Sequence, residues 1–327
     1  MKRYFMRAAA VLALVLAVAG VTSAYAQQYP GRPIRMIVPF PPGGSTDIVA
    51  RVVAQKLSEA LGQQVIVDNR GGGAGGIIGT DLAAKAPADG YTLLMSSTIT
   101  YSVGAALYKN KLPYNVLTDF EAVTMISTVP LALVVHPSLP ARSVKELIAL
   151  AKAKPAQINY ASFGIGTSGH LAMEMFKLMA GVDIVHVPYK GGGPALIGLI
   201  GGEVQTLFIS TVAALPHVKS GKLRAVALTS LTRSANLPDI PTVAETVSGY
   251  EVVVWYGLFA PAGTPNSVIG RLNKETVRAV QSRDMQERFA AEGGRTVGNT
   301  PEQFQEIIKA DVAKWAKIVK DAGITVE

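Results

Sequence analysis

The sequence of 327 residues contains no cysteine. Disulfide bonds, thiolate metal sites and cysteine nucleophiles are therefore excluded, and stability has to come from buried apolar cores. The four histidines do not fall at metal-ligand spacings, either with one another or with acidic residues. We therefore expect no metal and no cofactor.

The sequence also has no dense run of Lys and Arg and no basic stripe with interleaved aromatic residues, so nucleic acid is not an expected partner. Its 31 Lys and Arg against 23 Asp and Glu give a net charge of +8. Three of these cations lie in the first 26 residues, and the rest of the chain carries 28 cations against 23 acids, or +5. This mild excess is compatible with an anionic small molecule.

The only membrane-like stretch lies at the start of the chain. Lys2, Arg3 and Arg7 precede an apolar run over residues 8–21, and Ala24-Tyr25-Ala26 forms an A-x-A cleavage site. We therefore expect residues 1–26 to be a signal peptide that is cleaved near Ala26. No cysteine near that site could carry a lipid anchor, and no later segment reaches the ~18 apolar residues of a spanning helix. The mature chain is expected to be soluble and exported.

Short apolar runs alternate with helical patterns, which predicts an α/β fold with a mostly parallel sheet. The expected strands are 35–40, 64–68, 91–97, 131–136, 157–163, 183–189, 204–210, 224–229 and 251–259. The expected helices are 47–61, 77–85, 144–152, 170–180 and 195–200, followed after residue 265 by three helical patterns without a strand between them, the last at 302–321.

About 300 mature residues exceed what one hydrophobic core usually serves, so two domains are expected. No long Pro/Gly/Ser linker separates them, which indicates that strands cross between the domains. We place these crossings near residues 128–130 and within 251–259. The expected lobes are residues 27–128 plus 253–327, and residues 129–252.

Two segments combine a strand, a turn rich in Gly, Ser and Thr, and the start of a helix. The first loop spans residues 39–47 and the second loop spans residues 162–170. A helix start has up to four N–H groups without partners and the positive end of the helix dipole, so each loop can bind an anion. The expected donors are the N–H groups of Gly43, Gly44, Ser45, Gly166, Thr167 and Ser168.

Two other functions fit these loops less well. Residues 164–169 match the G-x-G-x-x-G pattern of dinucleotide sites, but the acidic residue about twenty positions later is missing. A hydrolase could use Ser168 with His170, but there is no G-x-S-x-G motif. The serines stand where helix N-caps stand, and capping is the simpler role for Ser45, Thr46, Thr167 and Ser168.

Two side chains beside the loops have open roles. Asp47 is expected to favour the dipole of its helix and to point away from a bound anion. His170 lies one turn into the second helix and either contacts the pocket or packs in the core.

The mature chain resembles Bug-type, TctC-like periplasmic receptors of tripartite tricarboxylate transport systems. The resemblance covers about residues 29–323 and rests on PIRMIVPFPPGGSTD at 33–47, VDNR at 67–70, ADGYT at 88–92, TSGHL at 167–171, VPYKG at 187–191 and PHVKSGKLR at 216–224.

This resemblance implies a periplasmic, non-enzymatic, two-lobed binding protein of the type II-like flytrap class, with two strands crossing between its lobes. It implies that backbone amides and ordered waters of the two loops hold a carboxylate, and that the ligand passes to membrane permease subunits. The candidate ligand-binding residues are Phe40, Pro41, Gly43, Gly44, Ser45, Asp47, Thr98, Ser162, Phe163, Gly164, Gly166, Thr167, Ser168, His170, Tyr189, Lys190 and Ser210.

One departure from the family pattern bears on the ligand. Members often carry an acidic residue where this chain has Gln205 and Ile209-Ser210, which argues against an amino acid whose ammonium group needs a partner. We expect a mono- or dicarboxylate, bound by a monomer, with Thr98, Tyr189, Lys190 and Ser210 at its distal end. Phe40 and Phe163 could instead favour an aromatic carboxylate. A receptor that signals to a membrane sensor kinase is the alternative to delivery to a permease.

Overall fold

The structure is a computed structural model that describes residues 29–43, 45–72, 76–108, 111–291, 293–321 and 323–324. The expected signal peptide and Gly44 lie outside the described residues. Within these ranges, no helix combines the length and the apolar character needed to cross a bilayer.

The described residues form a mixed sheet of ten strands in the order β2-β1-β3-β9-β4-β7-β5-β6, with β8 and β10 both pairing with β4. The strands are β1 (Ile34–Val38), β2 (Val65–Asn69), β3 (Thr92–Ser97), β4 (Phe120–Val135), β5 (Asn159–Ser162), β6 (Val185–Pro188), β7 (Thr206–Ser210), β8 (Arg224–Leu228), β9 (Val253–Pro261) and β10 (Arg295–Thr296).

Helices cover the sheet, and their apolar residues recur at helical spacing. In α2, for example, Val49, Val53 and Leu57 recur every four residues and are buried. The helices are α2 (Ser45–Leu61), α3 (Ile77–Ala84), α4 (Gly104–Tyr108), α5 (Val144–Ala153), α6 (Ser168–Ala180), α7 (Gly192–Ile200), α8 (Thr211–Lys219), α9 (Asn266–Val280), α10 (Arg283–Ala291) and α11 (Pro301–Asp321), with a short π-helix, η2 (Ile99–Val103), and a 3-10 turn, η4 (Val243–Glu245).

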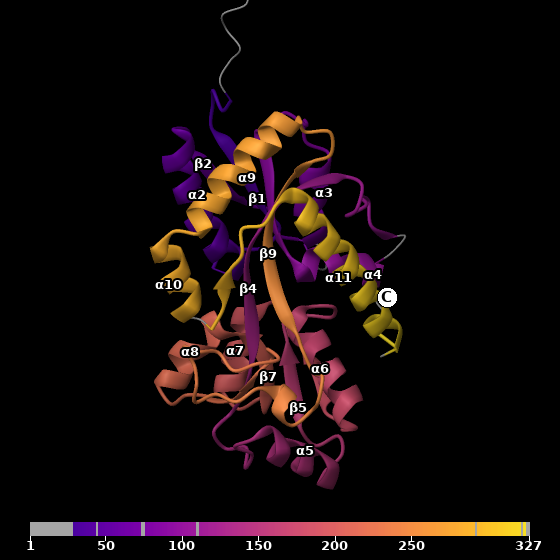
Figure 1. Cartoon of the computed structure of the whole chain (residues 1–327). Coiled ribbons are helices and arrows are strands. Elements are labelled where there is room, and N and C mark those ends of the chain that lie inside the picture. The colour runs from indigo at the N-terminus through magenta and orange to yellow at the C-terminus, as the bar shows by residue number, and fades with distance from the viewer. Residues whose placement is uncertain are drawn as a thin grey trace, which may run out of the picture.

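Two groups of helices lie at opposite ends of the long strands β4 and β9. Figure 1 shows α2, α3, α9 and α11 around the upper end and α5 to α8 around the lower end. Strand β4 pairs with β9 as far as Pro130 and with β7 and β8 from Leu131 onward, so it belongs to both halves of the sheet. On this change of partner we propose residues 27–128 plus 253–327 as the first lobe and residues 129–252 as the second.

The predicted crossings lie where β4 changes partners and directly before β9. Among the described strands, β4, with 16 residues, pairs in both halves of the sheet, whereas β9 pairs with β3 and β4. Two details of the predicted architecture are wrong. The sheet is not mostly parallel, because β4 and β9 are antiparallel to each of the neighbours recorded for them in the described residues. Strand β10 lies between α10 and α11, where no strand is expected.

An aromatic cluster in the first lobe fixes the segment that follows β3. The Tyr101 ring of η2 stacks on Phe259, with ring centroids 4.2 Å apart, and lies against Phe120 and Trp255. Phe304 of α11 contacts the same two rings, Trp255 and Phe259. Because Tyr101 is 1% exposed, the backbone at the carboxyl end of β3 is held from behind by packing.

Candidate functional site

The carboxyl ends of two sets of parallel strands face each other between the lobes. Strands β1 and β3 are parallel neighbours in the first lobe, and β5 is parallel to both β6 and β7 in the second. Helix α2 begins after β1, and α6, α7 and α8 begin after β5, β6 and β7. Ligands of open α/β sheets bind at such carboxyl ends, where helix N-termini converge.

Two contacts join these edges. The Ser45 hydroxyl of α2 donates to the Ser210 hydroxyl, which lies at the N-cap of α8, over 3.3 Å. Leu107 of α4 lies so close to Gly166 of the second loop that a Cβ added to this glycine would stand 2.3 Å from the leucine Cδ1. The first and second loops therefore lie on the two sides of one boundary between the lobes.

A narrow cavity lies beside the Ser45 contact. Its volume of about 10 Å³ is close to the least that holds one water molecule. It is lined by Ser45, Ile48, Val49, Val52, Val129, Val212, Tyr256, Arg288 and Phe289. Most of these side chains are apolar, and they come from both lobes and from β4.

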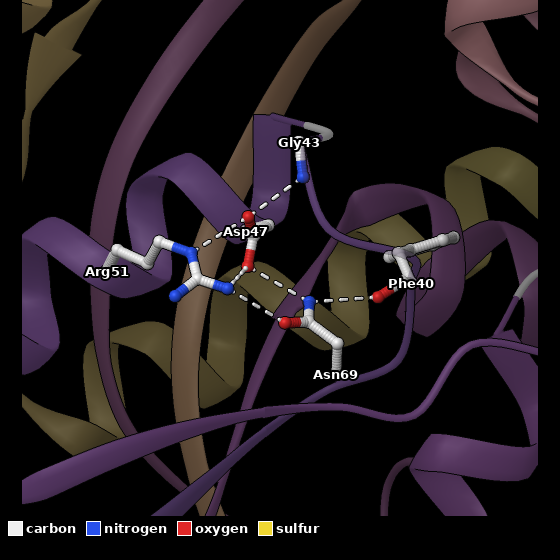
Figure 2. Close-up of polar contacts among 5 residues, drawn as sticks. All are labelled: Phe40, Gly43, Asp47, Arg51 and Asn69. Carbon is white, nitrogen blue, oxygen red and sulfur yellow. Dashed lines mark hydrogen bonds and ion pairs between the residues drawn. The ribbon is translucent and has the colours of Figure 1, made fainter.

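The Asp47 carboxylate organises the first loop. It accepts hydrogen bonds from the Gly43 N–H at 2.9 Å, from Arg51 Nε at 3.0 Å and from Asn69 Nδ2 at 3.0 Å (Figure 2). The same Asn69 amide donates to the Phe40 carbonyl at 3.0 Å, while its oxygen accepts from Arg51. Asn69 ends β2, so this network ties the first loop to the neighbouring strand.

Asp47 is 3% exposed and ionised. Burial raises the pKa of its carboxyl group, but hydrogen bonds from Arg51, the Gly43 N–H and Asn69 outweigh burial and hold the pKa below its ordinary value. Its carboxylate thus lies at the positive end of the α2 dipole and pairs with Arg51, at 3.0 Å. The Asp47 carboxylate faces the backbone of its own loop at Gly43, and its orientation away from a bound anion stays a prediction.

The second loop is organised in a similar way by His170. Nδ1 of this histidine accepts a hydrogen bond from the Gly166 N–H at 3.2 Å. The Thr167 N–H and hydroxyl both donate to the Gly164 carbonyl, at 3.3 and 2.8 Å. The Ser162 hydroxyl bonds with Gly164 as well, so the turn is closed by its own residues.

A stack of rings supports His170 from behind. Its ring lies 4.3 Å from that of His186 on β6, and His186 lies 4.8 Å from Tyr160 on β5. His170 is 6% exposed, and its ring packs against those of His186 and Tyr160. Burial, assisted by the neighbouring His186, lowers the pKa of His170 to about 4, so the ring is neutral at pH 7.

Three of the six expected backbone donors are not free. The N–H groups of Gly43, Gly166 and Thr167 already have acceptors, and Gly44 lies outside the described residues. N–H groups without a recorded acceptor lie instead in the first turns of the helices. Within the described part of the chain, the N–H groups of Ser45, Thr46 and Asp47 in α2 and of Ser168, Gly169 and His170 in α6 have no recorded acceptor.

The expected N-caps also differ. Thr167 is the N-cap of α6, but its side chain makes no capping bond and donates to Gly164 instead. Ser45 uses its hydroxyl for the contact with Ser210. The side chains at these helix starts therefore hold the loops together, and the first-turn N–H groups stay available.

The remaining candidate side chains divide into two groups. The Thr98 hydroxyl accepts from the Trp255 N–H, and the Tyr189 hydroxyl donates to Glu203, so both already have protein partners. Lys190 is exposed, and no ion pair of its ammonium is recorded among the described residues. Phe40 and Phe163 are half-buried and pack against different cores, and Pro41 is exposed. The Phe40 ring points away from the polar network in Figure 2.

Sequence reasoning missed the contributions of Arg51, Asn69 and the start of α8. Asn69 lies within the VDNR segment, which carried a family signal but no role. The position of Ser210 at the N-cap of α8 follows only from the ends of β7 and α8.

The comparisons with known proteins agree with this geometry. The family profile of the tripartite tricarboxylate transporter family receptor, TctC, matches residues 49–324. The chain belongs to the TctC family. Protein BugT of Bordetella pertussis is 45% identical to it over 322 residues, which are 97% of this chain and 98% of BugT.

Two solved TctC-like structures contain ligands. Rpa4515 of R. palustris with adipate is 37% identical, has a TM-score of 0.86 and aligns with 91% of this chain and 99% of its own. MatC of Rhodopseudomonas palustris with bound malate is 30% identical, has a TM-score of 0.81 and aligns with 89% of this chain and 100% of its own.

The protein is therefore a solute-binding receptor of the TctC family with the periplasmic binding protein fold, and it is not an enzyme. The hydrolase alternative also lacks its geometry. Nδ1 of His170 accepts from the Gly166 N–H, and no hydrogen bond from Ser168 to this ring is recorded within the described ranges.

Proposed function

We propose that this TctC-family protein is an exported periplasmic receptor that captures a small organic carboxylate between its lobes and delivers it to the permease subunits of a tripartite tricarboxylate transporter. The receptor acts as a monomer after cleavage of residues 1–26. Membership of the family supports the delivery step, and the adipate and malate named for two relatives support the class of ligand.

The convergence of helix starts from both lobes carries this proposal. The Ser45–Ser210 contact brings the starts of α2 and α8 together, and α6 begins beside α8 because β5 and β7 are neighbours. Charge-assisted hydrogen bonds are worth about 1.5–3 kcal/mol each, so four first-turn N–H groups contribute about 6–12 kcal/mol, a range that includes the ~8 kcal/mol of micromolar binding. The ligand carboxylate takes the N–H groups of Ser45, Thr46, Ser168 and Gly169.

A dicarboxylate fits better than an amino acid. Gln205 is uncharged and cannot form an ion pair with an ammonium group. Its side-chain oxygen already accepts a hydrogen bond from the Asn159 N–H at 2.9 Å. Lys190 directly follows β6 and its turn, and its neighbours Tyr189 and Gly191 donate backbone hydrogen bonds to Ser162 and Phe163 of the second loop. It attracts the second carboxylate at the rim of the site.

A thermal-shift panel on the mature chain tests this function. A ligand that binds only the native state raises the unfolding midpoint in a concentration-dependent way. We expect such a rise with adipate, malate or a related dicarboxylate, and none with sugars or with sodium chloride at equal ionic strength. A rise with sugars or cations but with no organic anion would overturn the proposal.

A further inference from the structure

The two loops contain the same local bond although their sequences differ. In each, a glycine N–H donates to the side chain four residues later, in the first turn of the next helix: Gly43 to Asp47, and Gly166 to His170. Both glycines have a positive φ, +85° and +79°. We call these two hydrogen bonds the loop latches.

We propose that Asp47 and His170 are positioning residues, which hold the two loops in the shape that binds the ligand and do not contact the ligand themselves. This inference rests on the proposed function, because it concerns the same carboxylate site. It differs from the set of candidate ligand-binding residues predicted from the sequence, which includes both Asp47 and His170.

Burial supports a positioning role. Asp47 is 3% exposed and His170 is 6% exposed, so neither offers appreciable surface to a ligand. The Asp47 oxygens are occupied by Gly43, Arg51 and Asn69, and Nδ1 of His170 is occupied by Gly166. The acceptor atoms of Asp47 and His170 are therefore used within the protein, and each accepts a hydrogen bond from the backbone of its own loop.

The benefit of the latches is conformational. Glycine loses more conformational freedom than any other residue when its backbone is fixed. If the ligand itself has to order such residues, the entropy cost lowers the affinity of the protein for the ligand. A latch fixes the glycine beforehand, and the first-turn N–H groups that follow are then already aimed at the boundary between the lobes. The ligand therefore binds loops that are ordered in advance.

The two loop latches differ in the charge of their acceptor side chain, and both are compatible with an anionic ligand. The Asp47 carboxylate is paired with Arg51, which reduces its repulsion of a second carboxylate. The His170 ring is neutral. The groups that face it are Tyr160 on β5, His186 on β6, and Glu174 and Lys177 on α6, and the last two pair with each other at 2.9 Å.

Paired substitutions at His170 test the second latch. In His170→Asn the amide oxygen stands about where Nδ1 stood and can accept from the Gly166 N–H, whereas His170→Leu has no acceptor. Both variants lose the ring stack, so a loss of packing affects both. We expect the dissociation constant for the dicarboxylate to rise about tenfold in His170→Leu, and by less than about threefold in His170→Asn. Equal affinities in the two variants, or tighter binding by the Leu variant, would overturn the proposal.

The same comparison applies to the first latch. Asp47→Asn keeps one acceptor for the Gly43 N–H, and Asp47→Leu keeps none. The Asn variant should bind more tightly than the Leu variant, even though its amide group also faces donors of Arg51 and Asn69. Equal binding by both would contradict the positioning role of Asp47.

The pH dependence of binding separates the latch from a merely structural role. Nδ1 of His170 accepts only while it is unprotonated, and its pKa of about 4 places the change well below neutrality. The ratio of the wild-type dissociation constant to that of His170→Asn should be flat above about pH 6 and rise below about pH 5. This ratio cancels protonation of the ligand. Asp47 is common to both proteins, so its protonation cancels in this ratio as well. A flat ratio down to pH 4 counts against the latch.

A measurement without ligand keeps the inference separate from the proposed function. Amide hydrogen exchange at Gly166 should be slow in the wild type and in His170→Asn, and fast in His170→Leu. If no carboxylate binds the wild type, the proposed function fails while the exchange result still decides whether the latch orders the loop. If the exchange rates of all three proteins agree, the latch is refuted even where a carboxylate binds.

Discussion

Asp47 and His170 accept the same kind of hydrogen bond, but only Asp47 is charged. The first loop therefore carries a fixed anion beside the start of α2, while the second loop presents the start of α6 without one. An incoming carboxylate meets less repulsion at the second loop, where the dipole and the free N–H groups act alone. At the scale of single residues, we therefore expect the second loop to contribute more of the binding free energy in the proposed site.

Lys190 provides a residue-scale prediction about the ligand's second charge. An exposed ion pair is worth about 0.2–1 kcal/mol, so Lys190→Met should raise the dissociation constant for a dicarboxylate by about 1.4- to fivefold and leave a monocarboxylate unaffected. The difference should shrink at high salt, because screening weakens exposed pairs. Titration calorimetry at two salt concentrations measures both effects.

Lys152→Met is the matched control, because Lys152 is an exposed lysine on α5, outside both loops. An equal loss for mono- and dicarboxylates in Lys190→Met would refute a role at the distal end.

The sequence predicts the two glycine-rich loops and their helix starts, because these depend on residues next to one another. It does not predict which donors stay free. Gly43 loses its N–H to an aspartate that Arg51 and Asn69 hold in place, and Asn69 reaches the loop only because β1 and β2 pair. The acceptor for Gly166 is buried by rings from β5 and β6. Such partners are fixed by tertiary contacts.

At the scale of elements, Thr229 joins the two connections between the lobes. Its hydroxyl accepts from the Leu131 N–H at 2.7 Å and donates to the Val252 carbonyl. Its own backbone N–H and carbonyl bond to the same two residues, at 2.9 and 3.0 Å. Leu131 lies where β4 changes partners, and Val252 directly precedes β9. Thr229, which is 0% exposed, therefore holds both connections side by side.

Thr229→Val should destabilise the protein by about 2–3 kcal/mol, because the Leu131 N–H and the Val252 carbonyl lose a buried partner without any change in side-chain shape. Urea unfolding of both proteins measures this difference. Thr229→Ser keeps the hydroxyl and serves as the control. A Val variant as stable as the Ser variant would show that the hydroxyl is not needed at this junction.

Most expected strands and helices lie within a few residues of those observed, since they depend on local apolar spacing. The first part of β4, from Phe120 to Pro130, was not predicted beyond the crossing near residues 128–130. This segment mixes Glu, Thr and Ser with its apolar residues, and it is buried by β9 and β10 on its two sides. Local pattern cannot predict burial that depends on strands far away in the sequence.

At the scale of the whole molecule, the second loop lies against the first lobe at Leu107. An added methyl group on Gly166 would stand 2.3 Å from the leucine Cδ1, whereas one on Gly43 would have nothing within 4 Å. Both glycines have similar positive φ values. Substitution by alanine would therefore strain the backbone at both Gly43 and Gly166, but only at Gly166 would the added methyl group also collide with the other lobe.

Gly166→Ala should weaken ligand binding more than Gly43→Ala does. Both variants carry a backbone strain of about 1–2 kcal/mol, but only Gly166→Ala opposes closure. Adding Leu107→Ala should return Gly166→Ala to the level of Gly43→Ala. Small-angle scattering with ligand should show a larger radius of gyration for Gly166→Ala than for the other variants. Equal affinities of the two single variants would argue against closure at this contact.

The sequence by itself determined the α/β class, the solute-binding family and the two glycine-rich loops, because each depends on adjacent residues or on a run of matched segments. Only the tertiary structure decided that β4 serves both halves of the sheet, that Asp47 and His170 accept from the loops, and that Ser45 meets Ser210. Those features join residues that are far apart in the sequence or have several possible partners. Strand pairing and burial select among the partners, and neither is encoded locally.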